Sequence, residues 1–148
     1  MNSKVLLALF IASGTCCVGF LWLGSRGLTM GRQIETAAVK WANKEIYPAF
    51  QNWDFEKAKP LFADEFFANN PEAKVKEFFV KFKENPGPIK QMQPFEAKGF
   101  QSNFETGKLA MVAVDLVSVA QFEKKTGDLK IKLVRTNDQW RIAAFLVP

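Results

Sequence analysis

Beyond residue 32 of this chain of 148 residues, the spacing of the apolar residues changes once, at the prolines around position 88. Before this point, apolar side chains recur every three or four residues, which is typical of a helix with one buried face. After it they alternate with polar ones, which is typical of a half-buried strand. Helices followed by a run of strands indicate the α+β class. The sequence therefore predicts helices first and an antiparallel sheet afterwards.

Three helices are expected before the change of spacing. The first covers about 33–47, and Pro48 ends or kinks it because proline lacks a backbone donor. The second starts after Asp54, an N-cap residue, and Pro60 bends it or delays its regular part. The third starts with Asn70 as N-cap and ends at the prolines of 85–88. Its apolar stripe is predicted to pack in the core, and contains Val75, Phe78, Phe79 and Phe82.

Four strands are expected after it, at 89–100, 108–122, 129–135 and 139–147. Short turns join them, which favours a four-stranded antiparallel meander. The strand at 108–122 is apolar on both faces. Val112, Val114 and Leu116 lie on one face, and the opposite face carries Met111, Ala113, Val117 and Val119. We expect a helix, a partner chain or a ligand to cover the second face.

Residues 5–24 contain no charged side chain. At about 1.5 Å per residue, a helix of this length spans the roughly 30 Å of a bilayer's hydrocarbon core. A cleaved signal peptide is an alternative, but cutting after the small residues 12–14 would leave an apolar stretch at the new amino terminus. Lipid attachment at Cys16 or Cys17 is another, although both lack the Leu-small-small pattern upstream. We therefore expect a retained single-pass anchor in the cell membrane.

The expected organisation is a tail and anchor at 1–24, a glycine-containing linker at 25–32 and one domain at 33–148. The charges that flank the anchor do not decide its orientation. The short amino-terminal tail favours an extracytoplasmic domain, in the periplasm.

Residue types exclude several kinds of site. The chain has no histidine, and its two cysteines, Cys16 and Cys17, both lie in the expected anchor. The domain therefore has neither disulfides nor cysteine or histidine metal ligands, and no metal or other cofactor is expected. All fifteen acidic residues lie beyond residue 32, so that most of the net charge of +5 comes from the flanks of the anchor. This distribution does not indicate nucleic-acid binding.

Two motifs and the order of the elements resemble one known superfamily. Residues 52–58, Asn-Trp-Asp-Phe-Glu-Lys-Ala, resemble a helix-turn-helix junction, and residues 137–142, Asn-Asp-Gln-Trp-Arg-Ile, resemble a final hairpin. Both are similar to motifs of the nuclear-transport-factor-two-like superfamily, the cystatin-like α+β cones. The resemblance implies a sheet folded around the first helix, an apolar pocket at the open end and, in many members, dimerisation through the sheet. Its members include isomerases, dehydratases, membrane-anchored assembly factors of secretion systems and small extracytoplasmic domains without an assigned role, so the resemblance does not select a function.

Three residues are candidates for a ligand site. A ketosteroid-isomerase-like arrangement in this superfamily would need a tyrosine on the first helix and an aspartate facing the pocket. Tyr47 is the only tyrosine, and Asp115 is the one charge in an apolar strand. Trp41 could line the same pocket. The alternatives are that Asp115 faces solvent or pairs with a lysine of the next strand, and that the two aromatic residues belong to the core and its rim.

The expected function is a membrane-anchored interaction or assembly domain without catalytic activity. It would bind a protein partner, or itself, through the sheet. The alternative is a protein with a pocket for a small apolar ligand, either a carrier or an isomerase-like enzyme, using Tyr47 and Asp115.

Overall fold

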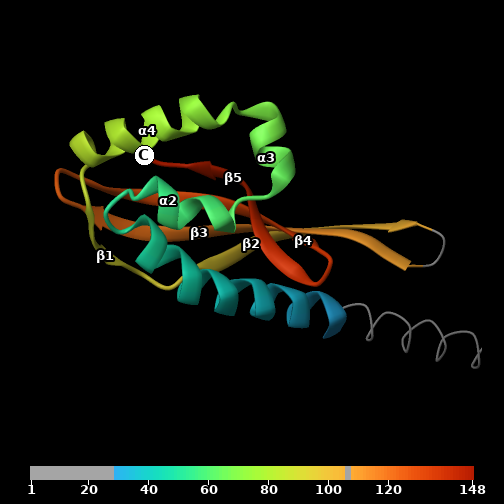
Figure 1. Cartoon of the computed structure of the whole chain (residues 1–148). Helices are drawn as coiled ribbons and strands as arrows, with labels where there is room; N and C mark the ends of the chain where they lie inside the picture. The colour runs from blue at the N-terminus through green and yellow to red at the C-terminus, as the bar shows by residue number, and fades with distance from the viewer. Residues whose placement is uncertain (1–28, 106–107) are drawn as a thin grey trace, which may run out of the picture. The chain divides into compact units, whose positions relative to one another are not determined.

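The computed structural model describes residues 29–105 and 108–148, with the backbone alone for 103–105 and 108–110 (Figure 1). The chain divides into two compact units, Met1–Ile34 and Glu35–Pro148, and the fold below is that of the second. The predicted anchor at 5–24 lies outside the described residues. Among the helices that are described, none combines the length and the hydropathy needed to cross a membrane. Residues 29–32, expected in a linker, are helical. Adding a turn to an existing helix costs little, even with a glycine in it.

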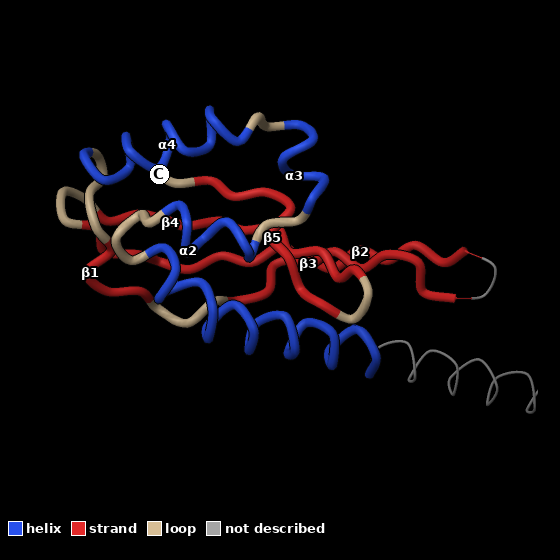
Figure 2. The backbone as a smooth tube through the Cα atoms, in the orientation of Figure 1, coloured by secondary structure: helices blue, strands red, loops and turns tan. Residues whose placement is uncertain are grey.

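The described residues form an α+β fold with four α-helices and a five-stranded antiparallel sheet (Figures 1 and 2). The first helix includes 29–50, and it is followed by α2 (Phe55–Ala58), the 3-10 helix η1 (Lys59–Leu61), α3 (Asp64–Asn69) and α4 (Glu72–Glu84). The strands are β1 (Ile89–Met92), β2 (Glu96–Glu105), β3 (Lys108–Phe122), β4 (Thr126–Thr136) and β5 (Gln139–Leu146).

The helical prediction was wrong in detail at three places. The first helix continues past Pro48 to residue 50. The single second helix is three short ones: α2 continues directly into η1, which contains Pro60, and extended backbone at Phe62 and Ala63, where Phe62 bridges Ile142 of β5, separates η1 from α3. Asn70 does not cap α4; its side-chain amide donates to the Phe66 carbonyl at 2.9 Å and so satisfies the end of α3.

The sheet has five strands where four were predicted, because the expected strand 89–100 is two strands. β1 and β2 both pair with β3, and residues 93–95 separate them. Pro94 has no donor for a sheet. The backbone N–H of Phe95 donates to the Asn43 side-chain oxygen at 2.8 Å, and the Ser118 hydroxyl donates to the Gln93 carbonyl at 2.5 Å. These two hydrogen bonds fix residues 93–95, between β1 and β2, to the first helix and to β3.

The core is a closed cluster of aromatic rings between the helices and one face of the sheet. Phe50, Trp53 and Phe79 are each at most 1% exposed, and their ring centroids lie 5.6 to 5.9 Å apart. From the sheet, Phe122 stacks on Trp53, and Phe145 contacts Phe50. The Trp53 indole N–H donates to the buried Gly87 carbonyl at 2.8 Å. Phe78, predicted for this core, is instead 49% exposed.

Candidate interaction surface

Strand β3 divides its side chains between the core and the opposite side of the sheet, here named the outer face. Val112, Val114 and Leu116 point into the core and are at most 2% exposed. On the outer face Met111 is 43% and Val119 47% exposed. The predicted second apolar face therefore exists, and within the described part of the chain no helix covers these two side chains.

The pairing of β3 with β4 sets which charges accompany these apolar residues. Asp115 pairs with Lys132, Val117 with Lys130, and Val119 with Asp128. Since paired residues in an antiparallel sheet lie on the same face, all six side chains belong to the outer face. On the other side of β4, Lys130 pairs with Leu146 of β5, and Leu146 is 62% exposed.

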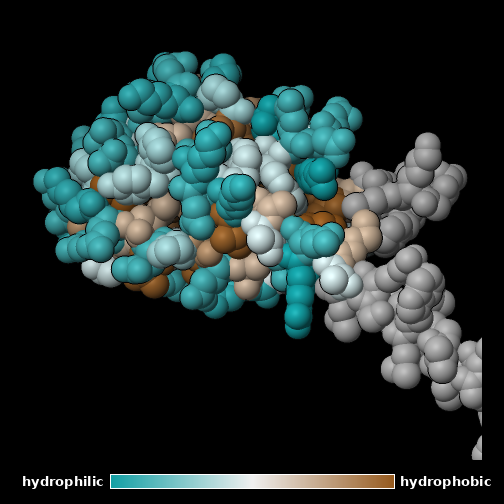
Figure 3. Space-filling view, turned by 90° about the horizontal axis from the view of Figure 1, so that it is seen from below, coloured by the Kyte–Doolittle hydropathy of each residue, from teal (hydrophilic) through white to brown (hydrophobic). Residues whose placement is uncertain are grey.

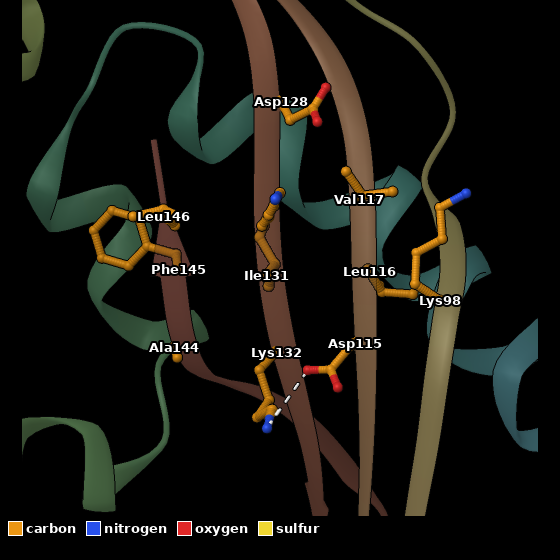
Figure 4. A pocket seen from close by; sticks show the side chains of 11 residues that line it. Lys98, Asp115, Leu116, Val117, Asp128, Ile131, Lys132, Ala144, Phe145 and Leu146 are labelled. Atoms are coloured by element: carbon orange, nitrogen blue, oxygen red, sulfur yellow. Dashed lines mark ion pairs between the residues drawn. The ribbon is translucent and has the colours of Figure 1, made fainter. Parts of the chain in front are cut away.

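These residues surround an open groove of about 530 Å³ on the outer face (Figure 4). Val117, Ala144 and Leu146 contribute apolar surface to it. The charged residues around them are Lys98, Asp115, Asp128, Lys130 and Lys132. The groove thus combines an apolar centre with charges of both signs, as protein interaction surfaces commonly do.

Four of the outer-face charges form ion pairs within the domain. The Lys132 ammonium lies 3.5 Å from the Asp115 carboxylate, and their side chains are 40% and 46% exposed. Lys98 lies 2.6 Å from Glu96, and this hydrogen bond lowers the pKa of Glu96 below its usual value. Solvent-exposed pairs of this kind contribute little to stability. Their importance is that, of the five charged residues around the groove, they leave Lys130 and Asp128 without a charged partner among the described residues.

The three candidate ligand residues do not share a cleft. Asp115 lies in the outer-face groove, paired with Lys132 as one of the two sequence alternatives had it. Tyr47 lies in a different cleft, of about 480 Å³, beside β1, where its hydroxyl is 3.4 Å from the Lys90 carbonyl and accepts from the Gln51 side-chain amide. Trp41 is half-buried and lines neither cleft. The described residues therefore do not bring together the tyrosine and the aspartate that isomerase-like chemistry would need.

A second apolar groove, of about 220 Å³, lies between α4 and the end of β5. Phe78, Phe82 and Phe145 line it, and Leu146 lines this groove as well as the outer-face one. Elsewhere, the side of the domain seen in Figure 3 is mostly hydrophilic, with apolar residues in small separate patches. Among the described residues there is no group of three or more histidine, cysteine, aspartate or glutamate side chains placed to hold a metal ion.

Sequence reasoning missed three members of the groove. Lys98 lies where the register of β2 shifts, Asp128 was assigned to a turn but belongs to β4, and Leu146, placed in the strand expected at 139–147, was not assigned to a face. The alternation of β4 gave a usable signal for Asp128, since it lies two residues before Lys130.

No known family model matches the sequence, and comparison with curated proteins finds no match. The functional argument therefore rests on the residues described above.

Proposed function

We propose that the protein is a membrane-tethered interaction domain without catalytic activity, which binds a protein partner or a second copy of itself through the outer face of the sheet. The observation that carries this proposal is the contrast between the two faces. The inner face is filled with rings, while Met111, Val119 and Leu146 are 43%, 47% and 62% exposed on the outer face.

Exposed apolar side chains that share one face of a sheet favour association. Burying apolar surface stabilises a complex by about 25 cal/mol per Å². Single exposed apolar residues are ordinary on soluble domains, but an apolar groove on the same face as exposed apolar side chains is typical of a binding surface. The polar rim formed by Lys98, Lys130 and Lys132 with Asp115 and Asp128 resembles the rim of a non-obligate interface.

The alternative function, a small-ligand or isomerase-like pocket, has less support. A pocket between sheet and helices would need space that Phe50, Trp53 and Phe79 occupy. Tyr47 and Asp115 line separate clefts, and the Asp115 carboxylate is paired with Lys132. A proton-transfer site needs an acid or base beside the reacting atoms.

The proposed tether is the uncharged segment 5–24, which would place the protein in the cell membrane with its domain in the periplasm. The order of helices before an antiparallel sheet supports a relationship to the nuclear-transport-factor-two-like superfamily. The membrane tether and the superfamily relationship are both part of this proposal. Retention of the full chain in membranes after extraction at high pH, and its release when residues 1–24 are removed, would support the tether.

The interaction surface is tested by the rate at which a thiol on it reacts. In the full chain with Cys16→Ser and Cys17→Ser, Val119→Cys places a thiol on the outer face, and Val80→Cys places one on α4. Val80 is a matched control for Val119, since the two valines are 54% and 47% exposed. In native membranes we expect maleimide to label Val119→Cys several-fold more slowly, because the bound partner covers it. Equal rates would contradict the proposal.

A further inference from the structure

We propose that the partner is a second copy of this chain, packed outer face to outer face about a two-fold axis that crosses β3 and β4 at the level of Ser118 and Leu129. In this arrangement Lys130 of each copy contacts Asp128 of the other. The inference rests on the proposed function, because it names the partner that binds the same face.

The register of the sheet defines the axis. Ser118 pairs with Leu129, and both side chains point into the core, at 2% and 0% exposed. A two-fold axis that lies in the interface at this level, across the strands, exchanges the residue pairs on its two sides. It therefore sets Val117 of one copy against Val119 of the other, and Lys130 against Asp128.

The charges of the outer face fit this exchange. Lys130 and Asp128 are exposed and lie two residues apart on the same face of β4. Neither forms an ion pair or a side-chain hydrogen bond with another described residue, whereas Lys132 is paired with Asp115. Burying an unpaired charge in an interface is costly. The two-fold arrangement gives both charges a partner, and it does so twice.

Neighbouring arrangements do not satisfy the charges. An axis at the level of Val117 would place Lys130 against its own symmetry mate, and an axis at the level of Leu116 would place it against Lys132. An axis parallel to the strands, between β3 and β4, would set Val117 against Lys130 and Val119 against Asp128. Among these four, only the proposed axis joins valine to valine and lysine to aspartate.

The dimensions of the face are compatible with a dimer. Packed sheets lie about 10 Å apart, a gap that a lysine and an aspartate reaching toward each other can bridge. The stretch of β3 from Ala113 to Gln121 pairs with β4, and Glu96 to Gln101 of β2 pairs with the same region of β3. Of the other strands, β2 covers only the part of this stretch up to Val117, and β5 covers only Lys130 to Val134 of β4, so nine residues each of β3 and β4 and six each of β2 and β5, at about 3.3 Å by 4.8 Å, give a flat footprint of about 480 Å².

The accessible area of a corrugated face exceeds its flat footprint, which brings it near the lower end of the standard range, about 600 Å² per partner. Tethering both copies to one membrane would raise their effective concentration, so that a moderate affinity suffices.

Charge exchange between β4 positions tests the arrangement. The experiment uses the full chain in lipid nanodiscs or mild detergent, with two distinguishable tags. Asp128→Lys gives a chain with two lysines at the contact, and Lys130→Asp gives a chain with two aspartates. Each variant alone should lose self-association by about a hundredfold or more, because like charges face each other twice. An equimolar mixture of the two should associate again as a heterodimer.

The recovered heterodimer would also show that both variants are folded. The doubly exchanged chain, Asp128→Lys with Lys130→Asp, should associate with itself like the wild type. The wild-type chain failing to dimerise, unchanged association of the single variants, or a mixture that stays monomeric would each overturn the inference.

The maleimide labelling rates distinguish failure of the two-fold dimer from failure of the proposed function. Slow labelling of Val119→Cys in native membranes, together with charge variants that fail the exchange, would mean that the face binds a different protein. Labelling of Val119→Cys as fast as Val80→Cys would remove both proposals.

Discussion

The closed interior can be tested at Trp53, whose indole is fully buried and whose N–H donates to the Gly87 carbonyl at 2.8 Å. Replacing it by phenylalanine removes this hydrogen bond and leaves the carbonyl unsatisfied in a buried loop, at a cost of about 1–3 kcal/mol. The smaller ring also leaves a cavity of roughly 40 Å³, which at about 24 cal/mol per Å³ adds about 1 kcal/mol. We therefore expect Trp53→Phe to lower the free energy of unfolding by about 2–4 kcal/mol.

The free energy of unfolding is measured by urea unfolding of residues 29–148, with circular dichroism as the signal. Trp41→Phe provides the matched control. Trp41 is half-buried, so the same substitution there should cost less than about 1 kcal/mol. Equal destabilisation by the two variants would refute the reasoning, because it would mean that the interior around Trp53 is neither closed nor dependent on the indole hydrogen bond.

Substitutions at two further positions test the break between β1 and β2 and the role of the candidate carboxylate. Asn43→Ala removes the side-chain oxygen that accepts the Phe95 N–H at 2.8 Å, and it should destabilise the domain by about 1–3 kcal/mol in the same unfolding assay. Asn43→Asp keeps an acceptor oxygen and should cost less. Equal costs of the two variants would argue against the hydrogen bond. Asp115→Asn breaks only an exposed ion pair with Lys132. It should therefore change the free energy of unfolding by less than about 1 kcal/mol and leave self-association intact. Loss of a ligand-dependent activity in this variant would favour the pocket alternative.

The sequence predicted those parts of the fold that depend on local periodicity. The strand predicted at 108–122 has the bounds of β3, and the alternation of Leu129, Ile131 and Leu133 with Lys130 and Lys132 matches their burial. Both follow from the two-residue repeat of a strand with one buried face.

The errors arose where contacts between distant segments decide the structure. The division of β1 from β2 depends on the bond between Asn43 and Phe95, 52 residues apart, and the break before α3 depends on the bridge between Phe62 and Ile142. Pro94 and Pro60 mark both places in the sequence. Proline indicates that a regular element is interrupted, but not what replaces it.

For the candidate site, composition and alternation predicted a second apolar face on the strand 108–122 that needs a cover. They could not predict that Tyr47 and Asp115 lie in separate clefts. A charged residue of a strand can face the helices or the opposite side of the sheet. The outcome depends on the register of the strand and on the side that the helices cover. Similarly, Lys130 and Asp128 became candidates only when the pairing of β3 with β4 placed them beside Val117 and Val119 on the outer face.

The most direct test of the outer face as an interaction surface is to introduce a photoreactive amino acid at Val119 and, as control, at Val80 in the full chain, and to irradiate native membranes. We predict a covalent protein adduct from position 119, at twice the mass of the chain, and none from position 80. The absence of an adduct at position 119, or equal adducts from both positions, would contradict the account.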